Sequence, residues 1–161
     1  MKQAQQDIPK TGLLKIWIIW GAMLFSLLVY VVICYLIEPT WGTLVTPDFP
    51  VDTLRNGLYA TSLIILFLSD YIRKYIMKSE SSTQLTRFNQ IASRTSMPPA
   101  LLKYQTAVII SLALSESIAI FGVVFFFLAK DLGTLYIFVF TSAAAMLYHR
   151  PKMSELMTNH S

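Results

Sequence analysis

Long, continuously apolar segments are the feature of this sequence that most constrains its fold. Four of them lie at about residues 13–37, 54–77, 100–129 and 132–149. A hydrocarbon core of about 30 Å is crossed by roughly 20 residues of α-helix, which satisfies its own backbone hydrogen bonds. Because the segments are apolar throughout rather than alternating, they predict helices and not the strands of a barrel. We therefore predict an all-α membrane protein with four transmembrane helices in two antiparallel hairpins.

The composition indicates that residues 1–161 form a single membrane domain. Hydrophobic residues make up 55% of the chain and charged residues only 14%, whereas about a quarter of a soluble domain is charged. Four helices leave little chain for a separate soluble domain. A polar linker at 78–99 separates the two hairpins, and Pro98 and Pro99 mark its end.

Lysine and arginine are distributed unevenly around the apolar segments. They concentrate before the first segment, between the second and third segments, and after the fourth, whereas the opposite side has only Arg55 and Lys130. Basic residues are retained on the cytoplasmic side of a membrane. We therefore expect both termini in the cytoplasm, and the compact layout with short tails favours a multi-pass protein of a bacterial inner membrane.

The net charge of +4 does not indicate a nucleic-acid partner. The basic residues flank apolar segments instead of forming a run on one polar face, so they indicate contacts with anionic lipid. We expect the lipid bilayer, other membrane subunits or further copies of the chain as partners.

Glu116 interrupts the third apolar segment and most needs an explanation. A carboxyl group at the bilayer centre costs at least about 2.5 kcal/mol on insertion scales, so such a group usually faces protein or water. Burial also favours the neutral acid over the carboxylate, which makes Glu116 a candidate for binding and releasing a proton. We predict that it points into the helix bundle.

The segment SESIAIFGVV, which begins at Ser115, resembles the ion-binding helix of the proteolipid subunit that forms ATP synthase rotor rings. In that family a carboxylate is likewise followed by an apolar run with an aromatic residue and glycine. The resemblance covers about residues 113–128 and implies that Glu116 occupies the position of the ion-binding carboxylate and Phe121 that of the aromatic residue. Elsewhere the chain is similar to small four-span membrane proteins in general, and its first helix has only Gly21 where rotor proteolipids have glycine-rich repeats.

Helix depth suggests neighbours for Glu116. It lies 14 residues inward from Lys130, or about 21 Å at a rise of 1.5 Å per residue. The same counting places four further polar residues at a similar level: Asp70, Arg73, Tyr148 and His149. One interpretation is a proton-accepting cavity open to the cytoplasm, with Tyr148 and His149 as relay or hydrogen-bond partners.

The alternative is a set of interfacial residues that pair with one another and hold the helix ends. We prefer it for Asp70, because Arg73 and Lys74 follow at i+3 and i+4, which suits local ion pairs. For Glu116 both interpretations stay open. Small residues also follow one stripe of the third helix and predict close helix packing: Ser111, Ser115, Ala119 and Gly122.

Motifs for catalysis or cofactor binding are not found in the sequence. His149 and His160 are 11 residues apart without companion ligands, so no metal is expected, and no phosphate loop or nucleophile elbow occurs. We therefore expect no cofactor and favour a non-catalytic subunit or assembly partner of a larger membrane complex. The alternative is a proton-binding or ion-binding transport element that uses Glu116.

Overall fold

The computed structural model describes residues 10–40, 42, 49–78 and 99–151. The regular structure within this part is entirely helical, and its elements are α1 (Lys10–Ile37), α2 (Val51–Lys78), α4 (Pro99–Ala129) and α5 (Leu132–Tyr148). The prediction of an all-α chain with four helices is confirmed for these residues. The predicted linker lies outside the described residues between 79 and 98.

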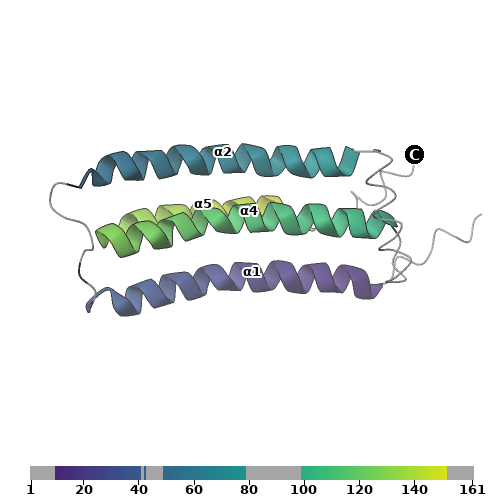
Figure 1. Ribbon diagram of the computed structural model, residues 1–161. Helices are drawn as coiled ribbons and strands as arrows, with labels where there is room; N and C mark the ends of the chain where they lie inside the picture. Colours follow the sequence, from purple (N-terminus) through teal and green to yellow (C-terminus); the bar gives the residue numbers. More distant parts are fainter. Residues whose placement is uncertain (1–9, 41, 43–48, 79–98, 152–161) are drawn as a thin grey trace, which may run out of the picture.

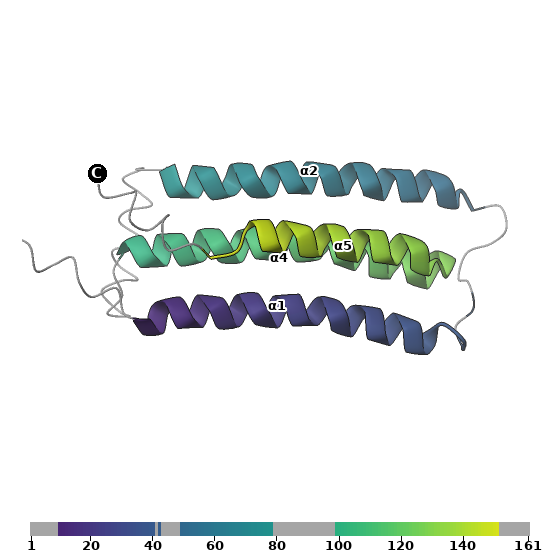
Figure 2. The ribbon, with the colours of Figure 1, turned by 180° about the vertical axis from the view of Figure 1, so that it is seen from behind.

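The α4–α5 hairpin forms the centre of the molecule, and α1 and α2 flank it on opposite sides (Figure 1). α4 packs against each of the other three helices, and α1 also packs against α5. Of the two antiparallel hairpins that we expected, α4 and α5 form one, whereas the pairing of α1 with α2 is wrong, because the α4–α5 hairpin lies between them (Figure 1). The view from behind shows that α5 ends well short of the other helices on the side where α1 begins and α2 ends (Figure 2). The inner side of the last turn of α5 therefore lies against the longer helices, with Met146 fully buried, while Tyr148 on its outer side is 67% exposed.

Local signals explain the helix ends around the hairpin. Pro99 opens α4, where its missing amide hydrogen costs nothing because the first turn has no internal acceptor for it. Lys130 adopts the left-handed conformation with φ 57 and donates its backbone N–H to the Phe126 carbonyl at 2.7 Å, which closes the C-terminal turn of α4. Asp131 then caps α5 by accepting from the Thr134 amide at 3.1 Å and the Thr134 hydroxyl at 2.6 Å.

The cap makes stability depend on the charge of Asp131. Partial burial alone would raise the pKa of Asp131, but hydrogen bonds from Thr134 and Gly133, together with the nearby Arg55 charge, hold it below the ordinary range. A lowered folded-state pKa contributes stability above the unfolded value of about 4, and this contribution is lost as the pH falls through the folded value.

We expect Asp131→Ala to lower the free energy of unfolding by about 1 kcal/mol at neutral pH, because α5 loses its N-cap. The difference between the two proteins should shrink as the pH falls below about 4, because the unfolded chain binds a proton at Asp131 before the folded protein does. Denaturant unfolding of both proteins in detergent at the two pH values measures this. A deficit that is the same at both pH values would show that the charge of Asp131 has no part in the cap.

Small residues allow α4 and α5 to pack closely. Ser111, Ser115 and Ala119 are fully buried, and the Ser142 hydroxyl on α5 donates to the Ser115 carbonyl at 2.6 Å. A Cβ atom added at Gly122 would lie 2.7 Å from Cβ of Phe138 on α5. The predicted stripe thus lies at the tightest contact of the hairpin.

Large apolar side chains cover much of the outer surface. Phe25 on α1, Phe67 on α2 and Phe140 on α5 are 65%, 76% and 75% exposed. By length and composition, the segments Leu14–Ile37 and Leu101–Ala129 can each cross a membrane, and the apolar helix Leu132–Tyr148 is shorter. These features support a membrane location, because soluble monomers rarely expose contiguous apolar surface of this extent.

Candidate functional site

Glu116 lies where α4 packs against α1. Its Oε1 atom is 2.8 Å from the Ser26 hydroxyl and 2.8 Å from the Tyr30 hydroxyl, both on α1. Ser26 and Tyr30 are one helical turn apart, so their side chains lie above one another on one face of α1. All three side chains are half-buried. The carboxyl group therefore faces two protein hydroxyls between α1 and α4, as expected for a side chain that points into the helix bundle.

Hydrogen counting shows that this site suits two protonation states. The Ser26 hydroxyl has one hydrogen but lies near two acceptors, Glu116 Oε1 at 2.8 Å and the Met23 carbonyl at 2.7 Å. When Glu116 is ionised, Ser26 and Tyr30 both donate to it. When Glu116 is protonated, its own hydrogen can go to Ser26, whose hydroxyl then donates to Met23. A single hydroxyl rotation thus accommodates gain or loss of a proton.

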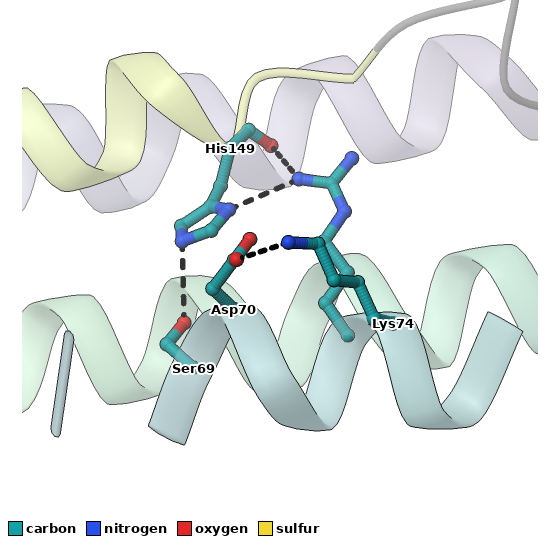
Figure 3. Close-up of polar contacts among 5 residues, drawn as sticks. Ser69, Asp70, Lys74 and His149 are labelled. Atoms are coloured by element: carbon teal, nitrogen blue, oxygen red, sulfur yellow. Dashed lines mark hydrogen bonds and ion pairs between the residues drawn. The ribbon is translucent and has the colours of Figure 1, made fainter. Parts of the chain in front are cut away.

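A second polar cluster joins α2, α4 and the end of α5, and it is buried. Arg73 Nη1 lies 3.2 Å from His149 Nδ1 and 3.2 Å from the His149 carbonyl (Figure 3). His149 Nε2 is 3.4 Å from the Ser69 hydroxyl, which donates to the Ser111 carbonyl at 3.3 Å. Arg73 and His149 are 8% and 3% exposed.

The hydrogen-bond donors in this cluster identify which ring nitrogen of His149 carries the hydrogen. A guanidinium group has only donors, so Nδ1 must accept the hydrogen bond from Arg73. The ring is then the neutral form that carries its hydrogen on Nε2 and donates it to Ser69, leaving the Ser69 hydroxyl free to donate to Ser111. Every step of this chain has a donor and an acceptor, which is what a buried polar cluster requires.

The end of α5 explains why this cluster is inside the molecule. The last carbonyl groups of a helix have no partner within the helix, and α5 ends among the longer helices (Figure 2). Trp20 Nε1 on α1 donates to the Met146 carbonyl at 3.0 Å, and Arg73 on α2 donates to the His149 carbonyl. The positive charge of Arg73 also suits the C-terminal end of the helix dipole. Two neighbouring helices therefore cap α5.

Asp70 and Tyr148 lie outside the buried part of this cluster. Asp70 forms its ion pair with Lys74 at 2.6 Å, and the Lys74 side chain is 74% exposed (Figure 3). The Tyr148 side chain is exposed and its ring meets the His149 ring edge-on at 5.2 Å. Local pairing of Asp70 is thus confirmed for Lys74, whereas the expected pairing with Arg73 is wrong, because Arg73 turns inward to α5.

The five polar residues expected at one level form two groups. Glu116 has Ser26 and Tyr30 as its hydrogen-bond partners within the described residues, whereas Arg73 and His149 belong to the cluster at Ser111. Glu116 is five residues from Ser111 along α4, which is about 7.5 Å along the axis and about 140° around it. Similar depth therefore did not bring the two groups together.

Sequence reasoning missed the partners that α1 supplies. Ser26 and Tyr30 are 90 and 86 residues away from Glu116, and Trp20 is 126 residues away from Met146. Their one detectable signal is polarity: Ser26 and Tyr30 are hydroxyl-bearing residues at i and i+4 within an apolar helix.

Among the described residues, no group of three or more His, Cys, Asp or Glu side chains could hold a metal ion. Comparisons with protein-family models, curated proteins and solved structures found no match to this chain.

Proposed function

We propose that this chain is a four-span integral membrane protein with both termini in the cytoplasm, and that it serves as a non-catalytic subunit or assembly partner of a larger membrane complex. The observation that carries this proposal is the exposed apolar surface on every helix. Ile120 on α4 is 44% exposed, and the phenylalanines on the outer faces of α1, α2 and α5 are exposed more strongly. Lipid or another membrane protein can cover such a surface without cost.

The helix arrangement supports crossings by α2 and α5 as well. Both run alongside α1 and α4 (Figures 1 and 2). The polar side chains that α2 buries face the bundle, where Ser62 and Ser69 are 4% and 0% exposed, whereas its apolar side chains face outward. A helix with this distribution suits lipid on its outside and protein on its inside. The excess of basic residues near the termini supports the orientation.

Purification in a mild detergent tests the subunit role. We expect the tagged chain to retain at least one different membrane protein in a fixed ratio, measured by native mass spectrometry. Two variants test which outer face holds the partner. Phe67→Ala removes exposed apolar contact area from α2, and Phe140→Ala removes a similar area from α5. Recovery of this chain free of any other protein under conditions that preserve known membrane complexes would contradict a subunit role.

A second candidate function is proton binding at Glu116, and the contacts on α1 favour it. The Ser26 hydroxyl lies within hydrogen-bond distance of both Glu116 Oε1 and the Met23 carbonyl, so the hydrogen bonds made by Oε1 are satisfied with and without a proton on that atom. Tyr30 donates in both states. An intramembrane carboxyl with partners of this kind is a reasonable element of a proton pathway.

We expect a membrane-soluble carbodiimide to modify Glu116, because this reagent reacts with protonated carboxyl groups in apolar surroundings. Glu116→Gln should retain the fold, since an amide can keep the hydrogen bonds to Ser26 and Tyr30, and should abolish the labelling. Peptide mass spectrometry at several values between about pH 5 and pH 8 measures the modified fraction.

Glu38→Gln is the matched control, because Glu38 lies at the outer end of α1 with its side chain 39% exposed. This change should leave the labelling of Glu116 unaltered. Absence of labelling at Glu116 across the whole pH range in folded protein would refute the proton site.

A further inference from the structure

The side of α4 that faces away from α5 carries a regular seam. Ala113, Ser117, Ile120 and Val124 follow one another at intervals of four, three and four residues. This is the heptad spacing that lets two helices pack along a shared left-handed seam. Ile120 and Val124 are 44% and 48% exposed. The seam combines two small residues, which permit close approach of a second backbone, with two β-branched residues that fill the space beyond.

The neighbouring helices leave this side of α4 accessible. α1 and α2 lie on opposite flanks of α4, and Figure 1 views the molecule from the side on which α4 lies in front of α5. α5 packs against α4 from behind, at Ser115 and Gly122. A further helix can therefore approach α4 between α1 and α2.

Glu116 borders the seam with one oxygen atom unsatisfied. Both hydroxyl contacts from α1 go to Oε1, and Oε2 accepts no hydrogen bond from the described residues. A carboxyl oxygen without a donor is costly in an apolar environment. Ser117 is the next residue, and its hydroxyl donates to the Leu114 carbonyl of its own helix at 2.7 Å, a local hydrogen bond that rotation about the Cα–Cβ bond exchanges for another acceptor.

We propose that this seam is the interface between two copies of the chain, and that the Ser117 hydroxyl of each copy donates to Glu116 Oε2 of the other. In a parallel heptad seam each side chain inserts between four residues of the facing helix. For Ser117 these four are Ala113, Glu116, Ser117 and Ile120 of the second copy. The carboxyl group and the hydroxyl group are thus brought together by the packing itself.

The same face of α4 carries both a donor, the Ser117 hydroxyl, and an acceptor, Glu116 Oε2. This self-complementary pair identifies the helix that packs against the seam as α4 of a second copy. A two-fold axis makes each surface meet its own equivalent, so one Ser117 and Glu116 pair produces two identical hydrogen bonds. The inference rests on the proposed function, because it requires that the helices span a membrane. Within that proposal it names the partner that binds this side of α4.

Disulfide cross-linking in lipid vesicles tests the interface. Cys34→Ser removes the only cysteine, and single cysteines are then introduced by Ala113→Cys or Ile120→Cys in the seam. Phe67→Cys and Phe140→Cys, on the outer faces of α2 and α5, are the controls for random collision. We expect dimers from the two seam cysteines and few from the controls at high lipid excess. Equal cross-linking at all four positions would overturn the proposal.

Single-molecule photobleaching in the same vesicles measures the association constant. Ser117→Ala should weaken association roughly tenfold, because two interhelical hydrogen bonds are lost. Thr141→Ala is the matched control, since Thr141 is an exposed hydroxyl on α5 that bonds within its own helix, and it should leave association unchanged. An unaltered association constant for Ser117→Ala would overturn the proposed hydrogen bond.

Accessibility of the termini in these vesicles separates this inference from the function on which it rests. Monomers with both termini on one side would overturn the dimer and leave the four-span proposal standing. Termini on opposite sides would overturn both.

Discussion

Replacing Arg73 with leucine is expected to lower the free energy of unfolding by about 2 to 4 kcal/mol. Arg73 Nη1 donates to both Nδ1 and the carbonyl oxygen of His149, which are buried. Leucine leaves these two acceptors without that donor, and each buried acceptor that loses its partner costs about 1 to 3 kcal/mol. The C-terminal end of α5 should therefore loosen first.

Lys74→Leu is the matched control for Arg73→Leu, because it removes the neighbouring cation without touching α5. Lys74 and Asp70 form an exposed pair at i and i+4, and such pairs contribute about 0.5 kcal/mol or less. Reversible unfolding in mixed micelles compares the two variants. If the two losses are equal, Arg73 acts only as a surface charge and does not cap α5.

The second large effect is expected for Gly122→Ala, which should destabilise the protein by about 1 to 3 kcal/mol. The new Cβ atom would lie 2.7 Å from Cβ of Phe138 and 3.3 Å from the Leu135 carbonyl oxygen. These atoms belong to the root of a side chain and to the backbone, so α5 as a whole must shift. Overpacking of a tight contact typically costs this amount and outweighs the higher helix propensity of alanine.

Gly21→Ala makes the same chemical change on α1, where a Cβ atom would meet nothing within 4 Å. It should be neutral or stabilise the protein by up to about 1 kcal/mol through helix propensity. Thermal unfolding of both variants in one detergent gives the comparison. A Gly122→Ala variant as stable as Gly21→Ala would mean that α4 and α5 do not meet at this residue.

The helices themselves could be predicted from the sequence because their signals are local. Apolar runs identify each helix, and Pro99 marks where α4 begins. The small residues Ser115 and Gly122 likewise indicated a close helix contact, because the size of a side chain can be read directly from the sequence. Features of this kind depend on a few neighbouring residues only.

The polar sites could be predicted only in part, because they depend on how the helices are rotated about their axes. Counting residues gives the depth of Glu116 and Arg73, but not the neighbour that each one meets. Glu116 meets α1 through Ser26, and Arg73 meets α5 through His149. The sequence did not indicate that the last carbonyl groups of the short helix α5 would accept hydrogen bonds from Arg73 and Trp20, because these two residues lie on other helices.

Four membrane crossings with cytoplasmic termini are the central claim, and accessibility labelling from each side of the membrane tests it most directly. In a Cys34→Ser background, single cysteines are introduced at Ser81, in the chain between α2 and α4, and at Thr46, in the chain between α1 and α2. A membrane-impermeant maleimide added outside intact cells should modify the cysteine at position 46 and not the one at position 81, and tags on both termini should be protected. Modification at position 81, or exposure of either terminal tag, would contradict the four-span topology.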